Sequence, residues 1–409
     1  MEFRPIISAM MRNKTAPLLI AAQVALTLAI ICNAIYIIRD RLSTASRPTG
    51  ADEQNLFEIR FFPHRPIADI RGMQLKDLQT LRAIPGVVSA AWANQIPLGQ
   101  SSWNIGGLTT DPAKREGPNL QATYYFSGNS LVDTFGLKLV EGRDFLPSEV
   151  IENDPRVDQV QTKHMIITKA LAERLFPDQA SVVGKIFYLG SGSGNDPVQI
   201  VGVVERLQSP SAPAGPVAEY SMIAPITYLD GYTRYSVRTE PGQRDRVMLE
   251  AEKALVALSN DRVMLGKQSF VEARARRYSG ERIMAGLLIA VTFFLLLITA
   301  SGIVGIASLW VNQRRKQIGV RRALGGRRID ILGYFMTENA IITTVGIAVG
   351  LTLALGLNRV LVSAIELPRL PILYLVVGMT VMWLLGLAAV SGPAWRASLV
   401  SPAIATRSV

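Results

Sequence analysis

Four long apolar runs restrict what this chain of 409 residues can fold into. A helix needs about 20 predominantly apolar residues to cross roughly 30 Å of hydrocarbon. Arg359 is the only charged residue inside the runs, and its long side chain can reach the membrane interface from near the end of the third run. The runs therefore predict four transmembrane helices, at residues 16–38, 283–311, 340–365 and 372–395.

The charges between the runs predict the orientation of the chain. Residues 1–15, 312–339 and 396–409 hold 12 Lys or Arg and three acids, whereas residues 39–282 are close to neutral. Because short cytoplasmic segments carry an excess of Lys and Arg, we expect the basic segments and both termini in the cytoplasm and residues 39–282 outside. A nucleic-acid partner is not expected, since the excess charge lies in short pieces next to the membrane and not on a folded basic face.

The segment before the first run has the periodicity of an amphipathic helix. Its apolar residues follow the spacing i, i+3, i+4, i+7, i+8: Phe3, Ile6, Ile7, Met10 and Met11. We interpret residues 1–15 as an interfacial helix on the inner leaflet, with a frayed tail as the alternative. The run that follows exceeds the length of a signal-peptide core, so we expect it to remain as a span.

Residues 39–282 predict a mixed α and β domain. The order strand, helix, strand occurs at 56–62, 75–86 and 87–94, and again at 233–240, 244–260 and 262–270. The two units can pair as a split ferredoxin-like lobe of residues 50–98 and 232–272, with a second lobe of about residues 99–231 inserted between them. The segment SPSAPAGP (209–216) predicts a mobile or partner-contacting loop. Cys32 is the lone cysteine and lies in the first run, so no disulfide within the chain is expected.

The residues give little sign of catalytic chemistry. His64 and His164 are far apart and have no Cys or paired acids near them in sequence, so no metal site is predicted. The Gly-Lys pair at 184–185 lacks the first glycine and the Ser or Thr of a phosphate-binding P-loop. The glycine-rich segment 190–195 joins two strand-like runs, which favours a hairpin connection. We expect no catalytic residue and no cofactor in this chain.

Several segments resemble one family. The stretch IGVRRALGGRRIDILGYFMTENAIITTVGIAVG (318–350) resembles the signature of the FtsX-like, MacB-type permeases of ABC transporters. Residues 124–145, 165–187 and 199–207 are similar to successive motifs of the MacB-type periplasmic domain, and residues 392–407 are similar to the end of the family's C-terminal domain. The resemblance covers nearly the whole chain apart from its N-terminal lobe.

This resemblance implies a fold, a location and a set of partners. It implies a membrane α+β protein with four transmembrane helices, in the bacterial inner membrane, with a large mixed α/β periplasmic domain between spans one and two. The implied partners are an ABC ATPase subunit, which carries ATP and Mg²⁺, and a second permease copy in a homodimer or heterodimer. A periplasmic adaptor is a further candidate. Because no P-loop is found here, the ATPase is expected on a separate chain.

The loop 312–339 contains the residues to which the resemblance gives a coupling role on the ATPase. These are Arg314, Arg315, Ile318, Gly319, Val320, Arg321, Arg322, Ala323, Leu324 and Gly325. We expect a helix at 313–324 that offers an apolar contact by Ile318 and Leu324, with Val320 or Ala323, between arginines that face acidic groups or lipid phosphates. Lys316-Gln317 replaces the acidic residue of the family pattern. A pure topology signal is the alternative.

Small residues also recur at intervals of four in two of the runs. Gly346, Gly350 and Ala354 form such a ridge in the third run, and Ser301 and Gly305 do so in the second. These ridges predict close helix packing, either within one subunit or between two.

Three functions are consistent with these features. The first is a permease that transmits ATP-driven motion to its periplasmic domain for export or extraction of a cargo. The second is an FtsX-like regulator that activates a cell-wall hydrolase. The third is a membrane-anchored sensor or adhesin without an ATPase.

Overall fold

The computed structural model of the chain describes residues 14–111, 120–157, 162–189, 196–213, 215–365 and 370–399. The chain forms two compact units, one of Ser46–Ser279 and one of the residues up to Ala45 together with those from Gly280 onward. The expected interfacial helix, the segment 190–195, most of the loop 366–371 and most of the tail 396–409 lie outside the described residues. We call the first unit the extramembrane domain and the second the membrane unit.

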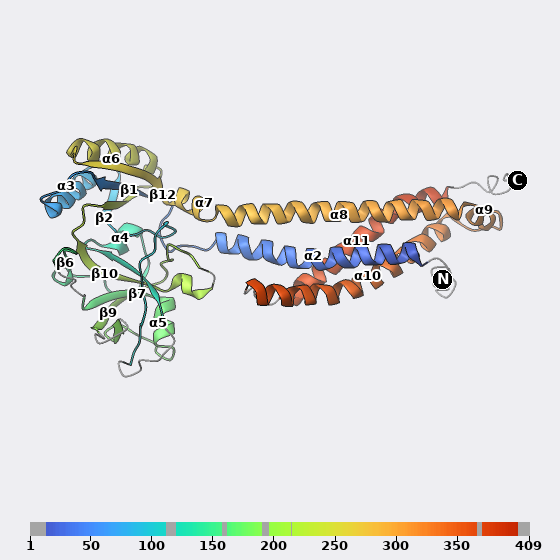
Figure 1. Cartoon of the computed structure of the whole chain (residues 1–409), viewed down its shortest axis with the longest axis horizontal. Coiled ribbons are helices and arrows are strands. Elements are labelled where there is room, and N and C mark those ends of the chain that lie inside the picture. The colour runs from blue at the N-terminus through green and yellow to red at the C-terminus, as the bar shows by residue number, and fades with distance from the viewer. Residues whose placement is uncertain are drawn as a thin grey trace. The chain divides into compact units, whose positions relative to one another are not determined.

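The membrane unit consists of long helices (Figure 1). Among the described residues, four helices are long and apolar enough to cross a membrane, namely α2 Thr15–Ala45, α8 Ser279–Gln313, α10 Arg328–Ile365 and α11 Ile372–Ser398. The short helix α9, Arg315–Ala323, lies between α8 and α10. With a mixed α/β domain between the first and second long helices, the expected fold class is confirmed.

The third long helix begins earlier than its apolar run. We expected the residues from Arg327 to Phe335 to start the next helix, ahead of a span at 340–365, and α10 indeed starts at Arg328. Asp330 lies in its first turn and accepts the N–H of Arg327 at 3.0 Å. A carboxylate at this position stabilises the positive end of the helix, so residues 328–339 belong to the same helix as the apolar run.

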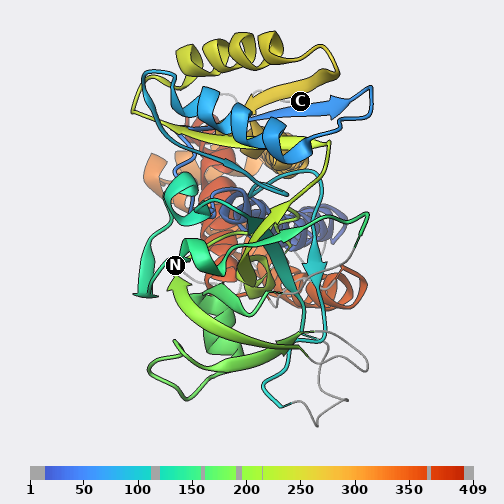
Figure 2. The same ribbon diagram turned by 90° about the vertical axis from the view of Figure 1, so that its left-hand side faces the viewer.

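One lobe of the extramembrane domain is a four-stranded antiparallel sheet with the strand order β12-β1-β11-β2. Its elements are β1 Leu56–Pro63, α3 Ile70–Arg82, β2 Val87–Trp92, β11 Thr233–Thr239, α6 Arg244–Leu258 and β12 Arg262–Ser269. The two strand-helix-strand units of the sequence therefore share one sheet. Alternate residues Phe57, Ile59 and Phe61 are buried in one hydrophobic core with residues of α3 and α6, and Figure 2 shows the two helices next to each other.

The second lobe is built on an eight-stranded mixed sheet with the order β3-β4-β10-β7-β9-β5, to which β6 and β8 add at β10 and β9. Its strands are β3 Asn104–Ile105, β4 Ala122–Ser127, β5 Leu139–Gly142, β6 Ile151–Asn153, β7 His164–Thr168, β8 Ile186–Leu189, β9 Asp196–Val204 and β10 Ser221–Tyr228. Short helices follow or precede these strands: α4 Leu131–Phe135, η1 Pro147–Glu149, α5 Lys169–Leu175 and η2 Pro216–Glu219. Helix α7, Phe270–Arg277, follows β12 of the first lobe.

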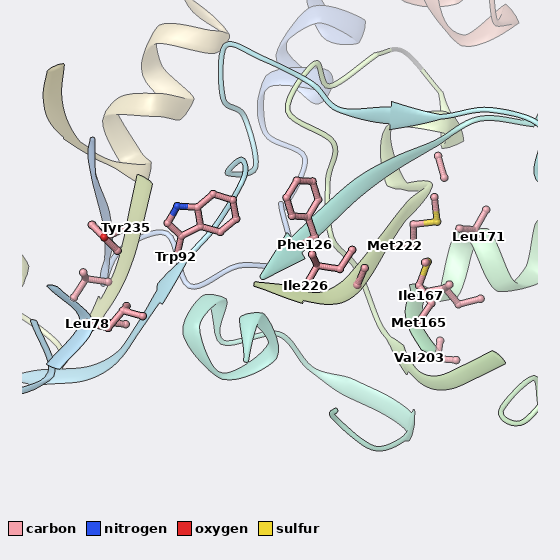
Figure 3. Close-up of a cluster of buried hydrophobic side chains, with 14 of the residues drawn as sticks. Leu78, Trp92, Phe126, Met165, Ile167, Leu171, Val203, Met222, Ile226 and Tyr235 are labelled. Atoms are coloured by element: carbon pink, nitrogen blue, oxygen red, sulfur yellow. The ribbon is translucent and has the colours of Figure 1, made fainter. Parts of the chain in front are cut away.

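A continuous hydrophobic core joins the two lobes. It contains Leu78 and Tyr235 of the first lobe together with Met165 and Met222 of the second, and Figure 3 shows these side chains on either side of Trp92. The Trp92 ring lies 5.9 Å from the ring of Phe126 on β4, between centroids. The two lobes of the extramembrane domain therefore share one hydrophobic core and are not independent domains.

Candidate functional site

Helix α9 is the centre of the predicted coupling segment. It ends at a turn in which Gly325 has a φ of +92°, a left-handed conformation that glycine adopts without strain. The N–H groups of Gly325 and Gly326 donate to the carbonyl oxygens of Arg322 at 3.2 Å and Arg321 at 3.0 Å. These bonds satisfy carbonyl groups at the end of the helix, so the Gly-Gly pair ends α9.

One face of α9 packs against the ends of three long helices. Ile318 is 5% exposed and lies in a hydrophobic cluster with Val311 of α8, Ile331 and Phe335 of α10, and Ala394 and Ala397 of α11. We expected Ile318 to offer a contact to a partner, but this contact is made within the chain. A helix with its apolar side chain in such a cluster cannot move without its neighbours.

The opposite face of α9 and the turn after it expose apolar residues. Val320 is 53% exposed, Leu324 is 83% exposed, and Ile329, at the start of α10, is 70% exposed. Ala323 is exposed beside them. The same segment carries four cations whose side chains make no ion pair, hydrogen bond or ring contact with the described residues: Arg315, Lys316, Arg327 and Arg328. The surface combines an apolar centre with positive charge, which suits a partner with an apolar pocket and an acidic rim.

Arg314 is bound inside the chain. Its Nη1 donates to both carboxylate oxygens of Glu338 on α10, at 3.1 and 2.9 Å, and to the hydroxyl of Tyr334 at 3.3 Å. Its guanidinium also lies 5.7 Å from the ring centroid of Trp310 on α8. Glu338 is 1% exposed. Because a buried carboxylate is stable only with a compensating charge, this pair fixes the start of α9 to α10.

Two more arginines that we expected to face outward have partners within the chain. Arg322 donates from Nη1 to the carbonyl oxygen of Ser398 at 2.6 Å, at the end of α11. The guanidinium of Arg321 lies 5.2 Å from the ring centroid of Tyr334. A cation at a helix C-terminus stabilises the unpaired carbonyl groups there. Of the four arginines that we expected to face outward, Arg315 and Arg321 are exposed, and Arg314 and Arg322 are half-buried.

The sequence pointed only partly to the ion pair of Arg314 and Glu338. Glu338 stands just before the third apolar run, within the stretch 318–350 that carries the resemblance. A buried acid needs a cation as its partner. Arg314 stands at the end of the preceding span, at the same membrane boundary, and this position could have identified it as the partner of Glu338.

The ridge of small residues in α10 packs against α2 of the same chain. A Cβ atom on Gly346 would lie 2.8 Å from the carbonyl oxygen of Ala21, and one on Gly350 would lie 2.9 Å from that of Ala25. Ala354 is fully buried. For this ridge the structure shows the contact within one subunit. In α8, a Cβ on Gly305 would meet nothing within 4 Å, and Ser301 is exposed.

The two peptide links of the extramembrane domain lie together. Arg274, on α7 near the C-terminal link, binds both oxygens of Glu53 at 2.6 Å and the carbonyl oxygen of Arg47 at 2.7 Å. Glu53 and Arg47 belong to the N-terminal link. These charge-assisted bonds tie the two links to each other.

The proline-rich loop packs on this junction. Arg47 donates to the carbonyl oxygens of Pro213 at 3.1 Å and Gly215 at 3.3 Å, and Arg277 donates to that of Ser211. We expected this loop to be mobile or to contact a partner. In the structure its carbonyl groups accept hydrogen bonds from both links.

Two family models match this chain. Residues 24–258 match the family described as MacB-like periplasmic core domain, and residues 289–402 match the family described as FtsX-like permease C-terminal. The coupling segment lies within the second match, and the extramembrane domain lies largely within the first.

Individual proteins are also similar to this chain. The pyoverdine export ATP-binding/permease protein PvdT of Pseudomonas syringae is 28% identical over 59% of this chain and 36% of its own length. The macrolide export ATP-binding/permease protein MacB of Agrobacterium fabrum is 26% identical over 76% of this chain and 46% of its own. The chain thus spans less than half the length of these relatives.

Among solved structures, the extracellular domain of the ABC-type transporter YknZ from Gram-positive bacteria aligns with a TM-score of 0.31 at 17% identity, over 51% of this chain and all of that one. The family models match a larger part of the chain, since residues 24–258 alone are more than half of it. The chain belongs to the family of MacB-like and FtsX-like ABC transporter permeases.

Proposed function

We propose that this protein is the permease subunit of an ABC exporter, in which a separate ATPase docks on α9 and drives motion of the extramembrane domain. The observation that carries the proposal is the two-sided environment of α9. Leu324 is 83% exposed on one side, while Ile318 is 5% exposed in a cluster with residues of α8, α10 and α11 on the other. A push on the exposed side therefore reaches three spans at once.

Contacts between neighbouring elements can transmit this motion, both in the membrane unit and in the extramembrane domain. The pair of Arg314 and Glu338 connects α9 to α10, and the ridge at Gly350 connects α10 to α2. In the extramembrane domain, the bonds of Arg274 join the links that lead to α2 and α8. Packed elements with such contacts move as units and not by gradual deformation.

In this proposal the chain itself hydrolyses no nucleotide, and ATP and Mg²⁺ bind to the partner. The protein lies in the inner membrane of a bacterium with both termini in the cytoplasm and the extramembrane domain in the periplasm, as the distribution of Lys and Arg indicates. A second permease copy, identical or related, completes the transporter. The names of the relatives support export of a cargo, with or without a periplasmic adaptor.

The test is co-purification of an ATP-hydrolysing partner with the full-length protein from its native membrane. We expect the wild type to retain the ATPase and Leu324→Asp to weaken its binding about tenfold or more, because a charge would enter the apolar centre of the contact. The matched control is Leu249→Asp, since Leu249 on α6 is exposed by 52% but lies in the extramembrane domain.

Two results would overturn this proposal. One is a wild-type complex without ATPase activity, and the other is equal retention of the ATPase by the two variants. Ile318→Asp is a poor test, because a charge at this buried position would disrupt the four-helix contact whatever the partner.

A further inference from the structure

Arg359 is a charged residue that the proposed mechanism does not use. It is exposed on α10 and makes no hydrogen bond or ion pair with any residue that the structure describes. Two other arginines near the ends of the apolar runs have partners. Arg314 binds Glu338, and Arg39 donates to the hydroxyl of Tyr374 at 3.1 Å. A guanidinium in an apolar helix needs an anion or water, so its surroundings indicate what it binds.

The position of Arg359 along α10 places it at a membrane boundary. Glu338 and Arg359 are separated by 21 residues of continuous helix, which corresponds to about 32 Å at the helical rise. This length is close to the roughly 30 Å of a hydrocarbon core. With Glu338 and its partner Arg314 at one boundary, Arg359 lies at the level of lipid phosphates at the other.

Aromatic residues near the start of α11 mark the same boundary. Tyr36 of α2 and Tyr374 of α11 are in edge contact, with ring centroids 5.3 Å apart. Tyrosine is typical of the interface between hydrocarbon and water. Leu370, four residues before Tyr374, lies in the wall of a cavity that also contains Arg359.

This cavity has a volume of about 480 Å³. Its lining consists of Leu355, Asn358, Arg359, Val362, Ser363 and Leu370. Three of these residues are apolar, and Arg359 is the only cation among the described residues of the lining. The cavity therefore offers an apolar surface and one positive charge at the depth where a phospholipid has its acyl chains and its phosphate.

Buried hydrogen bonds fix the shape of this cavity. Asn358 is 6% exposed, accepts the N–H of Leu370 at 3.1 Å and donates to the side-chain oxygen of Asn33 at 3.3 Å. Asn33 in turn donates to the carbonyl oxygen of Ala354 at 3.1 Å. Three chain segments are thus held together at the back of the cavity, and the site exists before a ligand enters.

We propose that this cavity binds one phospholipid molecule of the leaflet opposite to the α9 end, with the lipid phosphate on Arg359 and the start of an acyl chain along Leu355. The planar guanidinium can donate two parallel hydrogen bonds to phosphate oxygens. The inference goes beyond export, because it requires neither an ATPase nor a cargo.

The experiment is native mass spectrometry of the full-length protein, titrated with phosphatidylglycerol. We expect the wild type to retain one lipid and Arg359→Gln to bind it about tenfold more weakly, the loss that one charge-assisted contact predicts. Arg359→Lys keeps the charge and should retain most of the binding. The matched control is Arg282→Gln, since Arg282 is exposed at the start of the apolar part of α8 and does not line the cavity.

A second variant tests the cavity without changing its charge. Val362→Trp fills the space beside Arg359, and we expect it to exclude the lipid while the thermal midpoint stays close to that of the wild type. Unchanged binding by Arg359→Gln would overturn the proposal, as would equal losses in Arg359→Gln and Arg282→Gln, which would mean general charge attraction. Displacement of the lipid by inorganic phosphate would show a site for the free anion and not for a lipid.

Discussion

Asp77 and Arg262 form an ion pair inside the four-stranded lobe, where each side chain is only 1% exposed. Arg262 donates through both terminal nitrogens to Asp77, and its guanidinium lies 4.6 Å from the ring centroid of Phe61. Tyr235 adds a hydrogen bond to the same carboxylate at 2.6 Å. Burial raises the pKa of the Tyr235 hydroxyl well above its usual value, so this group remains a donor at all ordinary pH values.

Removal of one partner of the Asp77–Arg262 pair should therefore lower the stability of the extramembrane domain. Asp77→Asn leaves the charge of Arg262 buried without compensation, and we expect the free energy of unfolding of the extramembrane domain to fall by about 3–5 kcal/mol. Thermal unfolding followed by tryptophan fluorescence measures this change. The control Glu205→Gln breaks an exposed pair with Lys138 and should leave the midpoint almost unchanged. Similar thermal midpoints for Asp77→Asn and Glu205→Gln would contradict the expected contribution of the buried pair to stability.

Glu149 predicts a dependence of stability on pH. The Arg143 guanidinium binds its carboxylate at 2.7 and 2.8 Å and lowers the pKa of Glu149 to about 2, from a usual 4.5. A carboxyl group with a lowered folded pKa stabilises the fold above its unfolded pKa, and this contribution is lost as pH falls through the folded value. The window for Glu149 therefore runs from about pH 4.5 down to about pH 2.

The measurement compares the thermal midpoints of the wild type and Glu149→Gln across this window. At pH 6 we expect the wild type to be more stable, and we expect the difference to shrink as the pH falls to about 2, because the carboxyl group of Glu149 is then increasingly protonated. A difference that stays constant from pH 6 to pH 2 would assign the effect to something other than ionisation of Glu149.

Single residues also show which features the sequence predicts and which depend on the fold. The Gly325-Gly326 pair predicts the end of a helix from local backbone chemistry alone. The direction in which Ile318 points is not a local property, because it depends on Phe335 and Ala394, which come from later parts of the chain. The partners of Arg314 and Arg322 depend on the same contacts. The sequence thus indicated which segment matters but not which of its faces is free.

At the scale of elements, the contact between α2 and α10 depends on the absence of side chains at two glycines. We expect Gly350→Val to destabilise the membrane unit by about 1–3 kcal/mol, the usual effect of overpacking a close contact. Gly356→Val on the same helix is the matched control, because a Cβ there meets nothing within 4 Å. Thermal unfolding in detergent separates the two variants, and equal effects would show that helix propensity and not packing is responsible.

The elements of the two lobes differ in how far the sequence predicts them. In the first lobe, a strand, a helix and a strand repeat in the same order, and the short links within each unit leave few ways to pair them. In the second lobe, β10 pairs in parallel with β4, although the two strands are about a hundred residues apart. Alternation of apolar residues reveals such strands but does not encode their distant neighbours.

At the scale of the whole molecule, the shared core predicts how the extramembrane domain unfolds. Residues of both sheets belong to one hydrophobic cluster, and Trp92 bridges them through contacts with Phe126 and Tyr228. We expect residues 46–279, expressed alone, to fold and to unfold in a single cooperative transition, because the domain is large enough for its own core. Calorimetry tests this expectation, and two separate transitions would show that the lobes are independent.

The strand order of the first lobe has a consequence for how such proteins diversify. Because β1 and β12 are antiparallel neighbours with Phe57 opposite Ser269, the beginning and the end of the domain meet at one place. The ion pair of Glu53 and Arg274 closes that place. A domain whose ends coincide can be exchanged in evolution for another of different shape without rerouting the chain through the bilayer. The same four transmembrane helices can thus serve different functions when the extramembrane domain between the first two is replaced by another.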